Sequence, residues 1–305
     1  MDPMSFTASI ARLRWLVLLF PLLLGVNPTR SAGAPTPISF TFIDVGQGDA
    51  TLIRDGAGFD ILVDGGNKSA ANEVLETILK VGVDDLEIML ASHADLDHIG
   101  GLIEILESDE INVESVYYNG YPADTLTWQE FEIAAASDGL ILLPMQYPSS
   151  QTWGKFEVQV LNPPADLVNP DQNEASIVLL IDYAQIDFLL PGDIESGVEQ
   201  LLSTRVASLQ ADILKVAHHG SKFSSSQDFL EEVQPSEAII SVGMNSYGHP
   251  APETLDRLLS TDAGIWRTDM LGTITLTSNG SGYEITPKIT YFPLLFQVFL
   301  PANRQ

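Results

Sequence analysis

The stretch SHADLDHIGG, residues 92–101, places two histidines and two aspartates within six positions and ends in a glycine pair. The whole chain has 305 residues and only five histidines, so this concentration calls for an explanation. An apolar run that ends near Ala91 predicts a buried strand before the stretch, and a helical pattern begins near His98–Ile99. The stretch is therefore expected to be a loop at the carboxyl end of a strand, where open α/β sheets place their ligands.

The side chains of this stretch are suited to binding metal ions. Alternate residues His93, Asp95 and Asp97 of an extended loop could converge on one point, and His98 would join them from the first helical turn. Imidazole and carboxylate ligands without thiolates suit zinc, manganese or iron. Four ligands from so short a segment exceed what one tetrahedral catalytic site takes, so two metal ions that share a bridging group are expected. A solvated acidic loop with incidental histidines is the alternative.

The remaining histidines, and one further aspartate, also follow predicted strands. The apolar run LLPGD ends in Asp193, and the segments LKVAHHGS and SVGMNSYGHP add His218, His219 and His249. Histidines scattered at random over a surface would not all lie at the ends of strands. We therefore expect these side chains to belong to one functional site.

Strand and helix patterns alternate along the rest of the chain. Strands are predicted at 38–45, 49–55, 59–66, 86–91, 113–119, 140–143, 155–161, 211–217 and 237–243, in a hairpin over 176–193, and in the closing segments IWRTD and GTITLTS. Helices are predicted at 69–80, 99–107, 125–138, 194–203, 225–233 and 251–260, and a long loop at 162–176. Two such halves predict an α/β fold of two packed sheets with helices outside, a four-layer αββα sandwich, in one domain over residues 36–288.

The first 34 residues have the pattern of a secretory signal peptide. Arg12 and Arg14 precede an apolar run over 15–26, and small residues follow at 31–34. The run is too short to span a bilayer as a helix, which takes about 20 residues. We predict a secreted or extracytoplasmic protein whose mature chain has no integral membrane span. An uncleaved anchor is the alternative.

The other end of the chain, residues 289–305, is an apolar tail. Pro293 and Pro301 interrupt it, so it does not read as a spanning helix. We expect it to pack on the domain as an edge strand, because an exposed apolar segment of this size is a liability. A tail that sorts the protein to the cell surface is the alternative.

Acidic residues dominate the charge. The chain has 14 basic and 41 acidic residues, a formal net charge of −27. Without residues 1–34, 11 basic and 40 acidic residues remain, a net charge of −29. Such a protein repels polyanions at long range, so a nucleic-acid substrate would need bound metal ions or Lys215, Lys222 and Arg267 to hold it. The chain has no cysteine, which excludes disulfides, thiolate metal sites and cysteine nucleophiles.

Six segments together resemble the metallo-β-lactamase superfamily. They are, in chain order, FIDVGQGDA, ILVDGG, SHADLDHIGG, LLPGD, ILKVAHHGS and ISVGMNSYGHP. The similarity is greatest to the hydrolase domain of the ComEC-type competence proteins and their free-standing secreted homologues, and it runs from about Ile38 to Thr277. The resemblance implies an αββα fold with two divalent metal ions, zinc or manganese, between its sheets.

The resemblance also implies a role for each residue of the site. It makes His93 and Asp95 ligands of the first metal ion, Asp97 and His98 ligands of the second, Asp193 the bridging carboxylate, His219 the last ligand, and Asp64 a residue that orients ligands. Two positions depart from many members, because Asp95 replaces a histidine and the loop before Asp193 offers Asn173 and no histidine. Oxygen ligands favour manganese, whereas the general order of metal affinity favours zinc. The first metal ion would be bound weakly or exchange readily.

The expected function is that of an exported hydrolase with two metal ions. Two such ions generate a bridging hydroxide at neutral pH. Asp97, as an expected ligand of one of them, is also expected to be a catalytic residue. The charge of the site suits phosphodiesters, with DNA as one candidate. His218 and His249 would contact the phosphate or protonate the leaving oxygen, with Ser221 and Lys222 nearby. A hydrolase of small esters such as phosphorylcholine compounds, and a surface module with a non-catalytic metal site, are the alternatives.

Overall fold

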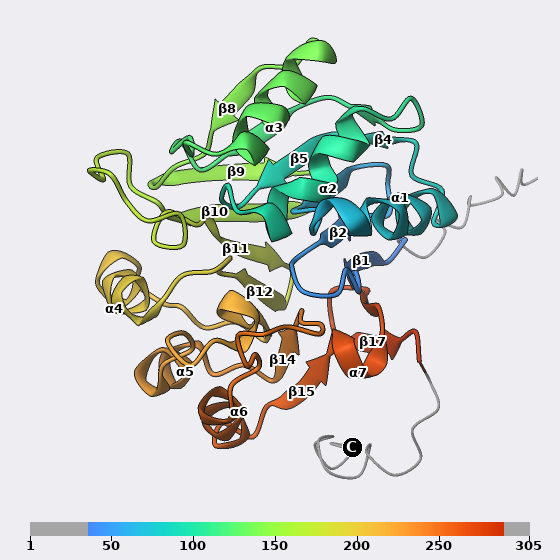
Figure 1. The fold of residues 1–305 in the computed structure, drawn as a ribbon. Coiled ribbons are helices and arrows are strands. Elements are labelled where there is room, and N and C mark those ends of the chain that lie inside the picture. The colour runs from blue at the N-terminus through green and yellow to red at the C-terminus, as the bar shows by residue number, and fades with distance from the viewer. Residues whose placement is uncertain (1–35, 290–305) are drawn as a thin grey trace, which may run out of the picture. The chain divides into compact units, whose positions relative to one another are not determined.

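Two β-sheets packed face to face form the centre of the protein in the computed structural model, which describes residues 36–289 (Figure 1). Within these residues the first sheet has eight strands in the order β17-β16-β1-β2-β3-β5-β7-β8. Their bounds are β1 (Ile38–Phe42), β2 (Thr51–Arg54), β3 (Asp60–Val63), β5 (Ile88–Ala91), β7 (Val116–Tyr118), β8 (Leu142–Pro144), β16 (Ile274–Ser278) and β17 (Tyr283–Pro287).

The second sheet, over the same described range, has seven strands in the order β15-β14-β13-β12-β11-β10-β9. Their bounds are β9 (Ser149–Trp153), β10 (Phe156–Asn162), β11 (Val178–Tyr183), β12 (Ile186–Leu190), β13 (Ile213–Lys215), β14 (Glu237–Ile240) and β15 (Gly264–Arg267). A small separate pair joins β4 (Asp85–Leu86) to β6 (Asn112–Val113).

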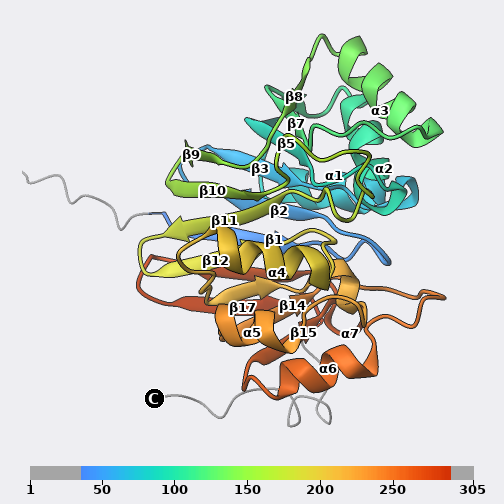
Figure 2. The same cartoon turned by 90° about the vertical axis from the view of Figure 1, so that its left-hand side faces the viewer.

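Helices cover the outer face of each sheet, as Figures 1 and 2 show. The first sheet carries α1 (Ala71–Lys80), α2 (Leu96–Leu106) and α3 (Leu126–Ser137), and the second carries α4 (Ser196–Arg205), α5 (Gln227–Val233) and α6 (Pro252–Leu259). Short helices are η1 (Lys68–Ala70), η2 (Ala217–Gly220) and α7 (Thr268–Leu271). This is the predicted four-layer αββα sandwich. None of the helices described between residues 36 and 289 is both long and apolar enough to cross a membrane.

Three apolar cores hold the four layers together, because successive residues of a strand point to opposite faces of its sheet. In β2, Leu52 packs in the core shared with α1, α2 and α3, whereas Ile53 packs in the core between the sheets. The rings of Phe40 and Phe188 stack across that middle core with centroids 3.7 Å apart. A third core joins the second sheet to its helices. The central strands of both sheets are therefore buried on both faces, whereas edge strands such as β9 and β17 keep exposed residues.

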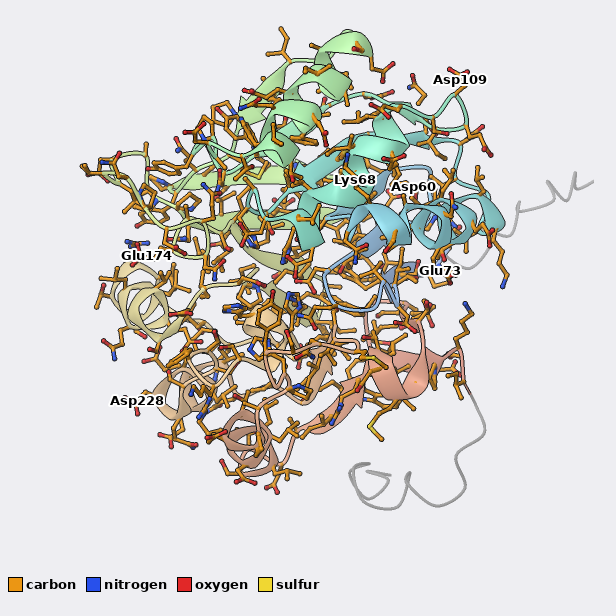
Figure 3. The ribbon with its side chains drawn as sticks, viewed as in Figure 1. Asp60, Lys68, Glu73, Asp109, Glu174 and Asp228 are labelled. Carbon is orange, nitrogen blue, oxygen red and sulfur yellow. The ribbon has the colours of Figure 1, made fainter. Side chains whose placement is uncertain are left out.

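Acidic side chains lie on the outside of these layers. Asp109, Glu174 and Asp228 are exposed and project from the edges of the ribbon in Figure 3. Two other surface carboxylates of the described residues pair with lysines, Glu73 with Lys288 at 2.7 Å and Glu130 with Lys68. Much of the negative charge is therefore solvated, and the buried carboxylates are the ones that need a structural account.

The parallel strands of the two sheets bring the candidate residues together. Strands β3, β5, β7 and β8 run parallel, and so do β12, β13, β14 and β15. Asp64 follows β3, His93 follows β5, Asp193 follows β12, and His219 follows β13. The carboxyl ends of these strands thus supply residues from both sheets, as open α/β folds do at their binding sites.

The helix predicted at 99–107 begins earlier than expected, at Leu96. Asp95 is the last extended residue before it, and its carbonyl oxygen accepts from the backbone N–H groups of His98 and Ile99, both at 3.0 Å. Asp97 and His98 therefore lie in the first helical turn, where a negative charge at 97 is favourable. The prediction of an extended loop in which 93, 95 and 97 alternate was wrong.

Other differences concern polar edge strands and the ends of the chain. Strands β9 and β17 were not predicted. SSQTW is mostly polar and YEITP is a short alternation that ends in proline, and the two strands form by pairing with β10 and β16. The predicted strand at 211–217 keeps only Ile213–Lys215, because the chain then turns into η2. The predicted signal peptide (1–34) and all of the tail beyond Ile289 lie outside the described residues and stay predictions.

Candidate metal centre

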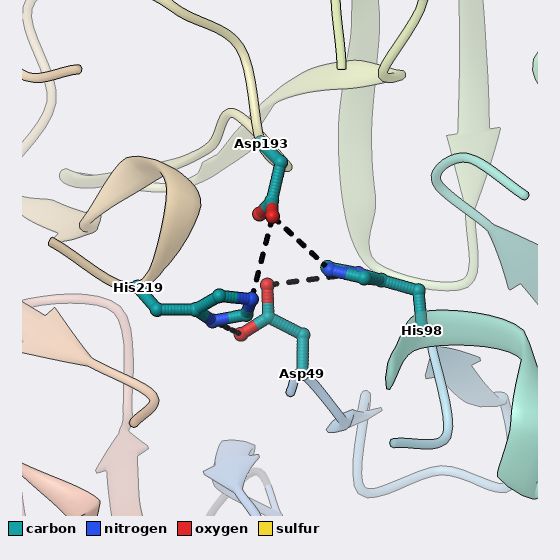
Figure 4. A group of neighbouring side chains, drawn as sticks. All are labelled: Asp49, His98, Asp193 and His219. Atoms are coloured by element: carbon teal, nitrogen blue, oxygen red, sulfur yellow. Dashed lines mark ion pairs between the residues drawn. The ribbon is translucent and has the colours of Figure 1, made fainter. Parts of the chain in front are cut away.

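Four buried side chains from four separate segments meet between the two halves of the fold (Figure 4). Each offers one ligand atom, and these atoms all lie within 4.8 Å of one another. The four residues, called the central cluster below, are Asp49, His98, Asp193 and His219. Imidazole nitrogens and carboxylate oxygens in this number are a donor set that divalent transition metals bind.

Close contact between two backbone segments positions His98. A Cβ atom added to Gly101 would lie 1.9 Å from the carbonyl oxygen of Gly65. The N–H of Gly65 donates to the carbonyl of His98 at 2.7 Å, and the N–H of Gly101 donates to that of Gly66 at 2.8 Å. The glycines of VDGG and HIGG therefore allow α2 to begin directly against the end of β3.

Protein acceptors determine the orientation of the two imidazoles in the central cluster. The Nδ1–H of His98 donates to Asp64 Oδ2 at 2.9 Å, and the Nδ1–H of His219 donates to the Ser241 carbonyl at 3.0 Å. Each ring therefore carries a hydrogen on Nδ1, and its Nε2 is the atom left to bind a metal ion or a proton. The same arrangement prepares histidines to bind metal in other sites.

His93 is oriented in the same way by a residue that the sequence reasoning missed. The hydroxyl of Ser92 donates to Asp64 Oδ2 at 2.7 Å and accepts from the Nδ1 of His93 at 3.0 Å. The rings of His93 and His98 lie with centroids 4.0 Å apart. Ser92 and Asp64 therefore orient two neighbouring imidazoles together, which extends the role expected for Asp64.

The Nε2 atoms of His93, His98 and His219 are buried and have no hydrogen-bond partner among the described residues. Those of His98 and His219 each lie 3.3 Å from Asp193 Oδ2, and that of His219 also lies 3.5 Å from Asp97 Oδ2. His93 Nε2 faces Asp95 Oδ2 at 3.7 Å. A lone pair that faces a carboxylate is repulsive unless a cation or a proton lies between them. These residues therefore fit bound metal ions.

The buried charges shift one another's pKa values strongly. Although burial opposes it, Asp193 and Asp64 raise the pKa of His98 well above its usual value, and Asp193 and Asp49 do the same for His219. Burial would raise the pKa of Asp193, but His219 and His98 hold it well below its usual value. Without metal, protons are thus held where cations would bind, and metal uptake must release them.

A family comparison identifies this arrangement. The sequence profile described as the metallo-beta-lactamase superfamily matches residues 43–243, which is about two thirds of the chain. The chain belongs to the metallo-β-lactamase superfamily. The match contains every residue of the central cluster, and it confirms the family that the six segments suggested.

Relatives within the superfamily include ComE operon protein 3 of Bacillus subtilis, which is 30% identical over 255 residues, or 76% of this chain and 32% of that protein. Recombination protein 2 of Haemophilus influenzae is 30% identical over 263 residues, or 82% of this chain and 30% of that protein. The chain spans about a third of the length of these curated relatives. The crystal structure of YhfI from Bacillus subtilis, a metallo-beta-lactamase fold protein, has a TM-score of 0.54 and 11% identity, and the match covers 79% of this chain and all of that one.

Asp49 is the member of the central cluster that the sequence reasoning missed. It follows Gly48, where an added Cβ would lie 2.3 Å from the carbonyl oxygen of Asp97, so the loop carrying Asp49 packs directly on α2. Its carboxylate pairs with the Lys215 ammonium, which also lies 3.8 Å from Asp193 Oδ1. The closely spaced glycines of GQGDA were the available signal. The prediction that Lys215 holds a nucleic acid was wrong, because its side chain is buried beneath the centre.

His218 and His249 lie beside the central cluster. His218 Nε2 is 3.9 Å from Asp193 Oδ2, and the rings of His218 and His249 are 5.4 Å apart. Burial lowers the pKa of His249 to about 4, and the charges of His218 and His219 add to this effect. His249 is thus neutral at neutral pH. It can accept a hydrogen bond, and it becomes a proton donor only when an anionic ligand raises its pKa.

The other predicted contact residues have local partners. Ser221 is buried and its hydroxyl accepts from the Phe223 N–H at 3.3 Å, while the exposed Lys222 ammonium lies 4.9 Å from the centroid of the Phe223 ring. Arg267 pairs with Asp269 at 2.7 Å. In the segment between β5 and α2, the N–H of Ala94 donates to the amide oxygen of Gln172, next to Asn173, at 3.1 Å. The roles expected for Ser221, Lys222 and Asn173 stay predictions.

Three residues at the centre have a strained backbone. The φ angles are 59° at Asp64, 51° at His218 and 54° at His219. They lie in the left-handed region, which residues other than glycine rarely adopt. Each such residue costs about 1–3 kcal/mol and persists only where its surroundings determine it. Strain of this kind is common at functional sites, and here it places one orienting carboxylate and two imidazoles.

Proposed function

We propose that this chain is a metal-dependent phosphodiester hydrolase that acts on nucleic acid. The observation that carries the proposal is a set of three buried Nε2 atoms, on His93, His98 and His219. They face the carboxylates of Asp95, Asp97 and Asp193 and have no hydrogen-bond partner within residues 36–289. Membership of the metallo-β-lactamase superfamily supports the same chemistry.

The residues of the centre would either bind metal ions or orient the side chains that bind them. His98, His219 and Asp97 would hold one divalent ion, His93 and Asp95 a second, with Asp193 shared, and zinc and manganese both suit these donors. When bound, the ions lower the pKa of water and stabilise negative charge on the phosphate. Asp64, Ser92 and Ser241 keep the three Nε2 lone pairs available.

His249 and His218 would act on the substrate. An anionic phosphate beside His249 would raise its low pKa, so that the ring can donate a proton to the leaving oxygen. His218, half-buried between His249 and Asp193, would contact the same phosphate. Both imidazoles lie close enough to the central cluster to reach a group bound there.

Support for nucleic acid as the substrate comes from the relatives. One carries the name recombination protein 2, and a protein of Neisseria gonorrhoeae that is 29% identical is named competence protein ComA.

We also propose that the protein acts outside the cytoplasm, as the pattern of residues 1–34 suggests. Sequencing the N-terminus of protein recovered from the culture medium tests this location, and protein found only inside cells contradicts it.

Metal reconstitution tests the hydrolase. The full chain is stripped of metal, reloaded with manganese or zinc, and given single-stranded DNA, bis-p-nitrophenyl phosphate and nitrocefin. We expect metal-restored cleavage of DNA, with a loss of more than about 100-fold in Asp193→Asn and little change in the exposed-site control Asp109→Asn. Cleavage of the small diester alone would favour a small-ester hydrolase. Bound metal without any turnover would contradict the proposal.

A further inference from the structure

The loop between β14 and α6 carries an exposed aromatic ring beside the central cluster. The side chain of Tyr247 is 74% exposed, and its ring lies 5.7 Å from that of His249 with 32° between their planes. The His249 ring lies 5.4 Å from that of His218, whose Nε2 is 3.9 Å from Asp193 Oδ2. A line of rings therefore leads from the centre to the surface and ends in Tyr247.

One side chain holds this loop in shape. Asn245 Oδ1 accepts from three consecutive backbone N–H groups, at 2.9–3.0 Å, and its Nδ2 donates to two carbonyls, at 2.8 and 2.9 Å. Farther along, the N–H of Ala251 donates to the carbonyl of Gly220 at 2.8 Å, which joins the loop to the segment that carries His218 and His219. The position of the Tyr247 backbone is thus set before any ligand binds, which lowers the entropy cost of binding.

The surroundings of Tyr247 suit a planar, anionic ligand. An aromatic ring that folding leaves exposed can receive a nucleobase on its face, and such stacking tolerates any base. The segment joined to this loop also presents the exposed Lys222 ammonium. Among residues 36–289 the Tyr247 ring pairs only with that of His249. A ring without a surrounding aromatic cage is a weaker receptor for a quaternary ammonium group such as choline.

We propose that Tyr247 is the platform on which a nucleobase next to the scissile phosphate stacks, and that it makes the enzyme prefer nucleotide esters and single-stranded nucleic acid over small phosphodiesters. This inference rests on the proposed phosphodiester hydrolysis and adds a substrate class to it. The bound base would lie over Tyr247 while its phosphate reaches His249 and the central cluster.

Two substrates that differ only in the nucleoside test the inference. Thymidine 5′-(p-nitrophenyl phosphate) and methyl p-nitrophenyl phosphate share a leaving group, so the ratio of their kcat/KM values reports recognition of the nucleoside. We expect wild type to prefer the thymidine ester and Tyr247→Ala to reduce that preference about tenfold, through KM for the thymidine ester. Tyr247→Phe, which keeps the ring face, should retain the preference. Ile141→Ala, at another exposed apolar residue, is the control.

Each outcome decides one of the two proposals. If wild type hydrolyses both esters and Tyr247→Ala leaves the ratio unchanged, the platform is wrong while the hydrolase stands. If wild type hydrolyses neither, the hydrolase is wrong, and binding of a fluorescein-labelled oligothymidylate, measured by anisotropy, decides the platform. Binding weakened about tenfold in Tyr247→Ala and retained in Tyr247→Phe supports it. Equal binding by all three proteins overturns it.

Discussion

Asp64 shows how a single residue outside the proposed ligand set can organise the centre. Its left-handed backbone aims the carboxylate at two neighbours, and it accepts from Ser92 N–H and Oγ–H, both at 2.7 Å, as well as from His98. Because Ser92 in turn accepts from His93, one carboxylate sets the tautomer of His98 directly and that of His93 through a hydroxyl. The metal affinity of the site should therefore depend on a residue that binds no metal.

Replacing Asp64 with asparagine should weaken metal binding by about 10- to 100-fold without unfolding the protein. The amide can place an N–H against His98 Nδ1, which removes the preference for a lone pair on Nε2. Competition with a chromophoric chelator measures the affinity, and circular dichroism checks the fold. Asp109→Asn, at an exposed position seen in Figure 3, is the matched control. Equal affinities in the two variants would contradict the role of Asp64.

Lys215→Met should destabilise the protein by about 3–5 kcal/mol, because it leaves the buried Asp49 carboxylate without its ammonium partner. Urea denaturation of the metal-free protein measures the loss. Adding Asp49→Asn to the same chain should recover part of it, since the uncompensated charge is then gone. Lys80→Met, at an exposed lysine, should have little effect. A Lys215→Met protein as stable as wild type would show that the pair adds no stability.

At the scale of elements, the start of α2 is the critical feature. The helix begins at Leu96, and its glycines pack on residues 65–68, just after β3, so closely that no side chain fits between them. This contact holds His98, in the first turn of α2, against Asp64, which directly follows β3. Moving α2 outward by the width of a methyl group would therefore change both the stability of the fold and the positions of the side chains proposed to bind metal.

Gly101→Ala should cost about 3 kcal/mol of unfolding free energy and weaken metal binding, because its methyl group would meet the Gly65 backbone, which cannot rotate away. Gly197→Ala is the control from another helix, α4, where an added Cβ meets no described residue within 4 Å. That change should be neutral or stabilising by up to about 1 kcal/mol. Urea denaturation compares the two variants, and similar stabilities would contradict the packing argument.

At the scale of the whole molecule, the central cluster joins the two halves of the fold. Asp49 and His98 come from segments of the first sheet and its helices, whereas Asp193 and His219 follow strands of the second. Bound cations would neutralise carboxylates contributed by both halves. The thermal stability of the entire described domain should therefore respond to metal.

Removing metal with a chelator should lower Tm by about 5–10 °C, since a ligand at 100 times its Kd adds about 2.7 kcal/mol of stability. Differential scanning calorimetry measures the shift, and Asp193→Asn should show a smaller one. The shift should shrink as pH falls, because Asp193 and Asp64 raise the pKa of His98 and protons then compete with metal for the ring. A shift that is equal in wild type and Asp193→Asn would place the metal elsewhere.

The sequence alone was sufficient for the layers and for most of the site. Consecutive apolar residues in the segments around Leu52 and Phe188 predict strands buried on both faces, and two such groups with helices between them predict the αββα sandwich. Histidines and aspartates placed directly after those runs predict a metal site, because strand ends are where side chains from distant segments can meet. Local patterns of this kind are visible in the chain before it folds.

The tertiary structure decided what depends on contacts between distant segments. Strand β16 pairs with β1, so that Ser278 lies opposite Ile38, and no local pattern specifies that pairing. Asp49 and Lys215 are separated by 166 positions, and only folding makes one the buried partner of the other. The early start of α2 likewise depends on its contact with the Gly65 backbone. The polarity of a segment and the spacing of its apolar residues are properties of the local sequence. Burial and the pairing of opposite charges arise only when distant segments pack together.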